Sequence, residues 1–263
     1  MTQLSQKSVV RRDTCRLCGS KNLKLALRLA PTPSGDAYVV EKDLEQSEEF
    51  FALDIVLCLD CGHAQLWEVV NPDLLYSGYT YTSSVSSGLA AHFKDYADSV
   101  LDGFKFPEKS LVLDIGSNDG TLLSFFQKRG MQVLGIDPAA HIAKQATQKG
   151  IQTLAGFFTQ DFARKIKQER GPVAIITANN VFANIDNLDD IIAGVKILLA
   201  QDGVFVMETS YLMDVLEKML IETVFHEHLS YFSLRPLQSF FKRHGMQVVD
   251  VKRVATKGGS LRV

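Results

Sequence analysis

The sequence has few cysteines, almost no net charge and no long apolar run. Its formal net charge of −2 gives no electrostatic reason to expect nucleic acid or an anionic membrane as the main partner. No apolar stretch approaches the length of a membrane span, and Met1–Asp13 is polar, without the hydrophobic core of a signal peptide. We therefore expect a cytoplasmic protein with a small-molecule substrate. Its 263 residues suffice for one large α/β domain and a small appendage.

All four cysteines lie in two short motifs, Cys15-Arg16-Leu17-Cys18-Gly19 and Cys58-Leu59-Asp60-Cys61-Gly62. Each pair of thiolates can chelate an ion from one tight turn, and the following glycine permits the φ > 0 geometry that aims backbone N–H groups at sulfur. A redox pair needs only one such motif, and a cytosolic setting disfavours disulfides. The pattern predicts a structural zinc ion, because four thiolates leave no open coordination position. The basic and aromatic interleaving of a nucleic-acid-binding zinc ribbon is absent from the sequence.

The stretch from Leu111 to Leu123 predicts a buried strand, a tight turn and the start of a helix. The strand ends in Asp114, and the turn contains Gly116 and Gly120. Gly116 lets the backbone turn sharply, and Gly120 removes a side chain where a ligand would approach the helix. A second strand, Val133–Asp137, ends in a carboxylate that can accept hydrogen bonds from both hydroxyls of a ribose.

Two nucleoside cofactors fit such a turn, and its spacing separates them. NAD-binding loops use G-x-G-x-x-G because a pyrophosphate must sit on the helix N-terminus. Here the spacing is Gly116-x-x-x-Gly120, with Asn118 at the position of the second glycine. Asp114 would repel a pyrophosphate but could hold the ammonium of an amino acid, directly or through water. The loop therefore favours S-adenosylmethionine, although any glycine turn between a strand and a helix looks similar.

From Leu111 onward, strand and helix patterns alternate. We expect strands at 111–114, 133–137, 151–155, 173–178, 204–208, 247–254 and 260–263, and helices at 121–128, 139–149, 159–169, 187–200 and 234–244. Seven strands ending in a hairpin-like pair match the doubly wound α/β sheet of class I methyltransferases better than a six-stranded dinucleotide domain. Ligands gather at the carboxyl ends of such strands. The expected cofactor-binding residues are Asp114, Gly116, Ser117, Asn118, Gly120, Asp137, Phe157, Asn179 and Asn180.

The region before this alternation is less regular. Ala30–Gly35 is turn material, and Phe50–Leu59 alternates as a strand entering the second cysteine motif. Tyr76 to Ser84 contains three tyrosines and several hydroxyls just before a helix expected at 87–101. This stretch is either a lid over a cofactor or substrate, or a polar connector whose tyrosines pack on a neighbouring domain; the sequence slightly favours the connector.

A polar cluster, Glu222 to Tyr231, follows the fifth strand of the alternation. His226 and His228 are two residues apart and cannot share a helix face, so this is not an H-E-x-x-H zinc site; in an extended loop they would point the same way. A histidine beside a carboxylate is a competent general base, because its ordinary pKa lies near neutrality. The alternative is a surface loop with incidental histidines.

Six motifs occur together: the two cysteine motifs, Tyr76 with Tyr81–Ser84, Asp114–Gly120, Asn180-Val181 and Phe225–His228. Over nearly the whole chain this combination resembles the sugar C-methyltransferases of deoxysugar biosynthesis. Those enzymes have an N-terminal zinc module, a central S-adenosylmethionine domain and a C-terminal domain, and they methylate the carbon next to the ketone of a nucleotide-linked 4-keto sugar. The resemblance implies that His228 is the base that removes the α proton. It implies that Glu227, the neighbour of this base, orients or polarises it, and that Tyr76 lies near the sugar.

The chain departs from that family in three places. The family usually has histidine where this chain has Asn184 and tyrosine where it has Phe225, so two titrating groups of the expected substrate pocket are replaced. The chain also stops at Val263, where the family continues into its last domain, which helps enclose the nucleotide sugar. This domain is expected to be missing here or supplied by a partner chain, unless the protein is a shorter enzyme with another acceptor.

The expected organisation is a zinc-binding module over residues 1–70, a tyrosine-rich connector and helix over 71–110, and an S-adenosylmethionine-binding methyltransferase domain over 111–263. The expected reaction is C-methylation of a nucleotide sugar. Two alternatives stay open: an O- or N-methyltransferase on a related sugar or natural product, and a non-catalytic cofactor-binding fragment that serves as an interaction module. The loop spacing disfavours an NAD-dependent sugar oxidoreductase.

Overall fold

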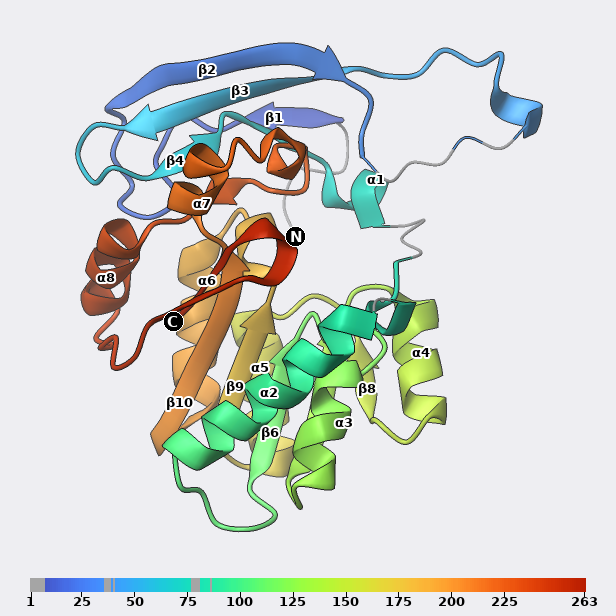
Figure 1. Ribbon diagram of the computed structural model, residues 1–263, viewed down its shortest axis with the longest axis vertical. Helices are drawn as coiled ribbons and strands as arrows, with labels where there is room; N and C mark the ends of the chain where they lie inside the picture. The colour runs from blue at the N-terminus through green and yellow to red at the C-terminus, as the bar shows by residue number, and fades with distance from the viewer. Residues whose placement is uncertain (1–7, 36–38, 40, 77–80, 86) are drawn as a thin grey trace. The chain divides into compact units, whose positions relative to one another are not determined.

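The computed structural model describes residues 8–35, 39, 41–76, 81–85 and 87–263 (Figure 1). The chain divides into two compact units. The first comprises Met1–Tyr79, Ala183–Leu188 and Thr209–Leu261, and the second comprises Thr80–Phe182, Asp189–Glu208 and Arg262–Val263. The first unit therefore joins the N-terminal region to segments from the second half of the chain. The three-part organisation expected from the sequence stays a prediction.

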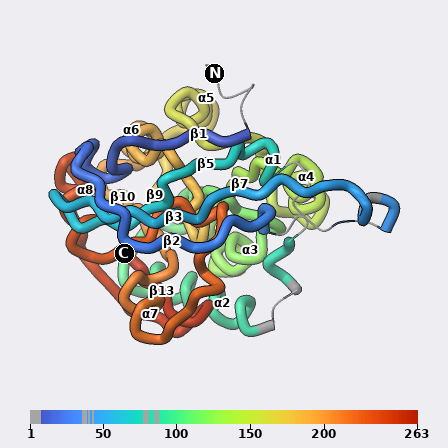
Figure 2. Tube along the Cα trace, turned by 90° about the horizontal axis from the view of Figure 1, so that it is seen from above, coloured from blue at the N-terminus to red at the C-terminus, as the bar shows by residue number. Residues whose placement is uncertain are grey.

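The first unit is built on a four-stranded antiparallel sheet with the order β11-β4-β3-β2. Its strands are β2 (Leu23–Thr32), β3 (Phe51–Cys58), β4 (Ala64–Leu66) and β11 (Ser230–Tyr231), and Figure 2 shows β2 and β3 running side by side. Every second or third side chain of β3 is buried, as expected for a strand with one face on a core. That core contains Leu53, Ala64, Leu66, Val69, Leu229 and Tyr231, so it draws on both ends of the chain.

The turn expected at Ala30–Gly35 is wrong for its first three residues, because β2 continues to Thr32. The register between β2 and β3 shifts between Leu29 and Thr32, which leaves Pro31 inside an irregularity of the ladder. Proline has no N–H to donate and is accommodated in sheets at edge strands and bulges. β2 is the last strand in its sheet, so a proline fits there.

Smaller elements complete the first unit. β1 (Val9–Arg11) pairs antiparallel with β5 (Glu68–Val70). The helices are α1 (Pro72–Tyr76), α7 (Leu212–Glu217) and α8 (Leu234–Arg243), with single 3₁₀ turns at Glu41–Asp43, Ile221–Thr223 and Thr256–Gly258. α8 buries Pro236, Leu237, Phe240 and Phe241 on one face, which confirms the helix expected at 234–244.

A seven-stranded sheet has the order β12-β13-β10-β9-β6-β7-β8. The strands β6 (Leu111–Ile115), β7 (Gln132–Asp137), β8 (Thr153–Ala155), β9 (Val173–Asn179) and β10 (Leu199–Ser210) are parallel. The two last strands, β12 (Lys252–Val254) and β13 (Ser260–Arg262), are neighbours at one edge. The seven-stranded doubly wound sheet expected from the alternation is thereby confirmed.

The helices of the second unit fall close to their expected positions. They are α2 (Ser87–Gly103), α3 (Thr121–Lys128), α4 (Ala140–Gln148), α5 (Gln160–Arg170) and α6 (Leu188–Leu198), the last beginning in the first unit, with 3₁₀ turns at Ser83–Val85 and Phe182–Asn184. α2 and α3 cover one face of the sheet and α6 the other (Figure 1). Residues from α2, α3 and the neighbouring strands form one core around Tyr96, Leu123 and Phe126.

Two strand boundaries differ from the expectation. The strand expected at 247–254 is confined to Lys252–Val254. Just before it, the backbone N–H of Val251 donates a hydrogen bond to the carboxylate of Asp250. Such a local bond competes with the sheet ladder. β10 begins at Leu199, five residues before the expected start, with a register shift between Leu199 and Val204.

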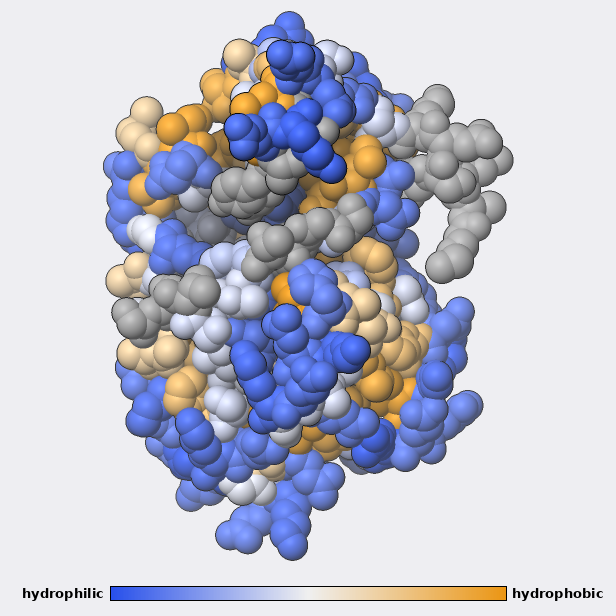
Figure 3. Space-filling view, turned by 90° about the vertical axis from the view of Figure 1, so that its right-hand side faces the viewer, coloured by the Kyte–Doolittle hydropathy of each residue, from blue (hydrophilic) through white to orange (hydrophobic). Residues whose placement is uncertain are grey.

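The surface drawn in Figure 3 mixes hydrophilic side chains with scattered apolar ones. Among the described residues, no helix is both long enough and apolar enough to cross a membrane.

Candidate functional site

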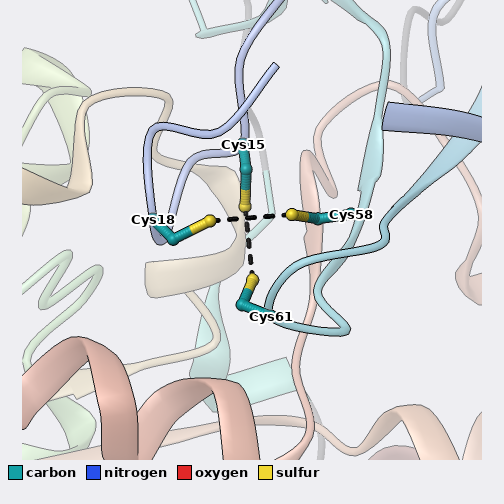
Figure 4. Close-up of side chains that lie close together, drawn as sticks. All are labelled: Cys15, Cys18, Cys58 and Cys61. Carbon is teal, nitrogen blue, oxygen red and sulfur yellow. Dashed lines mark hydrogen bonds between the residues drawn. The ribbon is translucent and has the colours of Figure 1, made fainter. Parts of the chain in front are cut away.

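The four cysteines of the first unit converge on one point (Figure 4). The sulfur atoms of Cys15 and Cys61 are 3.6 Å apart, those of Cys18 and Cys58 are also 3.6 Å apart, and all four lie within 4.8 Å of one another. Tetrahedral zinc with Zn–S bonds of about 2.3 Å separates its sulfur ligands by roughly 3.8 Å. The spacing and the all-thiolate donor set therefore fit one structural zinc ion.

The glycines after the two motifs adopt the left-handed backbone that the sequence predicts. Gly19 has φ 74° and Gly62 has φ 80°. Their N–H groups donate to the carbonyl oxygens of Cys15 and Cys58, both at 2.9 Å, and this closes each turn around its pair of sulfurs.

The glycine loop of the second unit is held by the strand beside it. The N–H groups of Gly116 and Ser117 both donate to the carbonyl oxygen of Ile136, at 2.8 and 3.0 Å. Asn118 has φ 51°, a left-handed conformation that asparagine tolerates better than most residues. This explains how Asn118 can stand where a dinucleotide loop has its second glycine. The side chain of Ser117 packs against Gly135, where a Cβ would clash with the Ser117 hydroxyl.

Gly116 makes the sharp turn expected of it, and Gly120 has a steric reason to be glycine that the sequence does not predict. Gly116 has φ 70°, and a Cβ there would lie 2.8 Å from Val181. Gly120 has φ 78°, and its Cβ would lie 2.8 Å from the side chain of Ile151. The space beside Gly120 is thus filled by the protein's own core rather than left for a ligand. Contact between Gly120 and a cofactor stays a prediction.

Asp137, at the end of β7, closes the loop through its carboxylate. Oδ2 accepts a hydrogen bond from the N–H of Asn118 at 2.8 Å, and Oδ1 accepts one from the N–H of Ala139 at 2.9 Å. Burial raises the pKa of this carboxyl, and the two backbone donors work in the opposite direction. Each oxygen retains a second lone pair, so the carboxylate can still accept a hydroxyl donor.

Asp114, at the end of β6, is buried between strands. Its Oδ1 accepts a hydrogen bond of 2.6 Å from the hydroxyl of Thr177 on β9. Burial raises the pKa of Asp114 to about 7, and the charge of Asp137 acts in the same direction. A cation beside the carboxylate would lower this pKa again. The expected contact with an ammonium group stays a prediction.

The tyrosine-rich stretch is fixed to the glycine loop. Residues 77–80 lie outside the described part of the chain, but Tyr81–Ser84 does not. The Asn118 amide accepts from the N–H of Ser83 and donates to the carbonyl of Tyr81, both at 2.9 Å. Asp119 Oδ2 accepts from the N–H of Ser84 at 2.9 Å. This segment therefore lies against the candidate cofactor loop. The choice between a lid and a connector stays a prediction.

The remaining strand ends carry a second polar group, around Glu208, whose partners the sequence pattern does not predict. Phe157 is half exposed after β8, and Asn179 and Asn180 follow one another at the end of β9. The Glu208 carboxylate, on β10, bonds His92 Nε2 at 2.6 Å and Arg262 Nε at 2.8 Å. Burial alone would raise the pKa of Glu208, but these partners hold it below its ordinary value. The partners come from positions 92 and 262, so no local motif announces them.

The residues around His228 form a turn rather than an extended loop. The N–H of His228 donates to the carbonyl of Phe225 at 3.0 Å. His226 is buried, and its Nε2 bonds the carbonyl of Phe51 at 3.2 Å. His228 bonds the carbonyl of Thr223 through Nδ1, at 2.8 Å. A carbonyl oxygen only accepts, so the two histidines carry their protons on opposite nitrogens.

His228 is therefore held as the tautomer with a lone pair on Nε2. Burial lowers the pKa of His228 to about 4, although the bond to Thr223 acts in the other direction. The imidazole is neutral at physiological pH. The side chain of Phe225 lies against it, with ring centroids 4.1 Å apart. Glu227, between the two histidines, is 4% exposed.

Tyr76 meets one of the two replaced positions. It is the last residue of α1, and its hydroxyl accepts a hydrogen bond of 3.2 Å from Nδ2 of Asn184. Both residues belong to the first unit. The structure thus brings together two residues, 108 positions apart in the chain, that the resemblance assigns to one substrate pocket.

Comparison with protein families gives two matches. A family described as "Putative zinc binding domain" matches residues 15–76, which include all four cysteines. A family described as "Methyltransferase domain" matches residues 90–251, which include the glycine loop and the His226–His228 turn.

Among curated proteins, the C-methyltransferase NovU from Streptomyces niveus is 34% identical over 249 residues. The match covers 95% of this chain and 59% of that protein, so the chain spans about three fifths of its relative's length. Among solved structures, the PH0226 protein from Pyrococcus horikoshii OT3 matches with a TM-score of 0.52 and 14% identity, over 72% of this chain and 96% of that one. A chain of the Haloferax volcanii complex that contains the Trm112 methyltransferase activator matches with a TM-score of 0.51 and 16% identity, over 65% and 78%. These two structures are similar in fold.

Purified protein should contain about one zinc ion per chain, because four thiolates complete one tetrahedral site. Cys61→Ser should lose the metal and lower the melting temperature. Asp60→Asn is the matched control: Asp60 bonds Ser20 and Asn22 in the same turn without being a ligand, so this variant should keep its zinc. Elemental analysis and thermal melting measure both quantities. Metal-free protein that melts like the zinc-loaded form would contradict the assignment.

Gly120→Ala should cost more stability than Gly130→Ala. Both glycines have left-handed backbone, with φ 78° and 83°, but a Cβ at Gly130 meets nothing within 4 Å. The left-handed backbone costs alanine about 1–2 kcal/mol at either position. The overlap with Ile151 should add roughly 1–3 kcal/mol at Gly120 alone. Denaturant titration of the two variants measures the difference in free energy of unfolding, and equal losses would show that the backbone alone requires glycine at 120.

Proposed function

Since the chain belongs to the methyltransferase-domain family, we propose that it transfers a methyl group from S-adenosylmethionine to the carbon next to the ketone of a nucleotide-linked 4-keto-deoxysugar. The relative NovU, a C-methyltransferase, supports carbon as the acceptor, since it matches this chain across both the cysteine motifs and the methyltransferase domain. The zinc ion is structural in this proposal and takes no part in the transfer.

The cofactor is proposed to bind at the loop 116–120 and the adjoining strand ends. Asp137 is proposed to accept hydrogen bonds from the ribose hydroxyls, and Asp114 to face the ammonium group. The half-exposed ring of Phe157 offers a surface for the adenine, and Asn179 with Asn180 completes the proposed site. Bound S-adenosylmethionine supplies a sulfonium methyl group that a carbon nucleophile can attack.

The observation that carries the proposal is the state of the His228 imidazole. Its Nδ1 donates to Thr223, which leaves the Nε2 lone pair as the proton acceptor. Its lowered pKa leaves that lone pair unprotonated at neutral pH, and it also makes the imidazole a weaker base than an ordinary histidine. A general base must be in this form before it can take a proton.

In the proposed reaction, Nε2 of His228 removes the proton from the carbon α to the ketone. The electron pair of the broken C–H bond passes into an enolate, whose carbon then forms the bond to the methyl group while the sulfonium sulfur keeps the pair of the broken S–C bond. Burial disfavours the imidazolium that His228 has become, so it releases its proton to solvent after the transfer. Glu227 is proposed to orient or polarise this histidine, and Tyr76 to contact the sugar.

The nearest alternative is methyl transfer to oxygen or nitrogen, in which His228 would deprotonate a hydroxyl or an amine of a related acceptor. This O- or N-methyl transfer uses the same cofactor site and the same base, so the product separates the two functions.

Labelled methyl transfer from S-adenosylmethionine to a panel of nucleotide 4-keto-6-deoxysugars tests the function directly, with the methyl position read by NMR. A new C–CH3 resonance is the expected result. A methoxy or N-methyl resonance would move the acceptor to the alternative. If no substrate is methylated while S-adenosylhomocysteine still binds, the proposed activity of this chain is wrong.

His228→Asn should abolish turnover and leave the affinity for S-adenosylhomocysteine nearly unchanged, because it removes the base from the first unit only. His226→Asn is the comparison variant. This histidine bonds the carbonyl of Phe51 from inside the same turn, so its replacement should lower the melting temperature and reduce turnover less than His228→Asn does. Equal loss of turnover and cofactor affinity in His228→Asn would assign the residue to structure or cofactor binding.

The pH dependence gives a separate check on His228. Its pKa is lowered to about 4, so the base stays neutral as pH falls from 7 to 5, and this group should not reduce turnover there. An unperturbed histidine, with a pKa near 6.5, would reduce it through this range. Histidine NMR titration of the intact protein should place the His228 midpoint near the lower value. A midpoint near 6.5 would contradict the buried, neutral state.

A further inference from the structure

Arg16 is a deeply buried charged side chain in the first cysteine motif. It lies between the zinc-site residues Cys15 and Cys18, and it is only 1% exposed. A buried charge is costly unless ionic and hydrogen-bond partners compensate it. The partners of Arg16 are therefore the reason that it can occupy this position.

The guanidinium reaches three acceptors from three separate parts of the chain. Nη1 donates to the carbonyl of Leu66 at 2.7 Å and to the carbonyl of Leu229 at 3.1 Å. Nε donates to Oδ1 of Asp186 at 2.9 Å. Arginine provides N–H donors in a fixed planar fork, whereas the lysine ammonium is a single compact point. One arginine can therefore hold all three segments at once.

Two of these acceptors adjoin the residues of the proposed reaction. Leu229 directly follows His228, and its carbonyl also accepts the N–H of Leu66 at 2.9 Å. Asp186 lies two residues beyond Asn184, whose amide donates to the hydroxyl of Tyr76. The same guanidinium is thus bonded next to the turn that carries the base and near the residue that contacts Tyr76.

The neighbouring arginine shows that these contacts are specific. Nη1 of Arg12 also bonds Asp186, through its carboxylate at 2.8 Å and its carbonyl at 3.0 Å. Nε of Arg12 donates to the carbonyl of Thr14, at 3.3 Å. Arg12 therefore shares the ionic partner of Arg16 and does not share its bond to Leu229.

We propose that Arg16 is a positioning residue, which fixes the backbone of the His226–Leu229 turn and the Asn184–Asp186 segment to the zinc-binding module. The module then acts on the reaction by holding the base in place. The catalytic part of this inference rests on the proposed role of His228; the fixing of the turn does not.

Arg16→Lys is the direct test, with Arg12→Lys as the matched control and Arg16→Gln, which keeps an N–H donor without the charge, as a second variant. In each full-length protein we would measure zinc content, S-adenosylhomocysteine affinity, kcat and KM of methyl transfer, and amide hydrogen exchange. Two amides report on the turn: His228, which bonds Phe225, and Leu66, which bonds Leu229.

Both Arg16 variants should keep their zinc and their cofactor affinity. Their amides at His228 and Leu66 should exchange at least about tenfold faster, because a fixed hydrogen bond at Leu229 is lost. kcat should fall by roughly 10- to 100-fold with KM for S-adenosylmethionine unchanged, as expected when a catalytic group is misplaced. Arg12→Lys should match the wild type in both respects.

Two results would overturn the proposal. One is unchanged exchange at both amides in the Arg16 variants. The other is exchange that rises uniformly through the first unit together with loss of zinc in both variants, which would make Arg16 a general stability residue. The exchange measurements are independent of turnover, so they decide the role of Arg16 even if the wild-type protein methylates no sugar.

Discussion

The pairing of β11 with β4 determines where the candidate base lies in the first unit. Ser230 and Tyr231 pair with Gln65 and Ala64, and Leu229 bonds Leu66 just before this ladder begins. The His226–His228 turn ends directly before this anchor, so its backbone has little freedom at that end. The strand supplying the anchor follows the second cysteine motif closely. The candidate catalytic turn is therefore fixed to a strand that follows the second cysteine motif, although more than 150 residues separate the turn from that motif in the sequence.

In the second unit, the irregular backbone of the loop 116–120 is held by side-chain acceptors instead of a strand ladder. The N–H of Asn118 is satisfied by Asp137, and those of Ser83 and Ser84 are satisfied by Asn118 and Asp119. Buried backbone donors left without such partners would each cost about 1–3 kcal/mol. The polar residues of the loop thus hold its shape in addition to any contact with a cofactor.

The sequence predicts what depends on local pattern. It predicts both end residues of α3, the seven strands of the larger sheet and the convergence of the four cysteines on one site. It does not predict the contacts of Arg16, of Glu208 or of the segment Tyr81–Ser84. The partners in these contacts are distant in the chain, and no periodic sequence pattern indicates them. The turn at His226–His228 is missed for a related reason: a two-residue spacing is compatible with a strand, and only the bond from His228 to Phe225 closes it.

The two replaced groups alter the surroundings of the proposed catalytic residues rather than those residues themselves. Phe225 lies against the His228 ring and offers it no hydrogen bond, which agrees with an environment that favours the neutral imidazole. Asn184 donates a hydrogen bond to the hydroxyl of Tyr76, which is the acceptor in this contact. A histidine at 184 or a tyrosine at 225 would bring its own proton equilibrium to the same contacts. In this chain, His228 and Tyr76 are the titratable side chains of these two contacts.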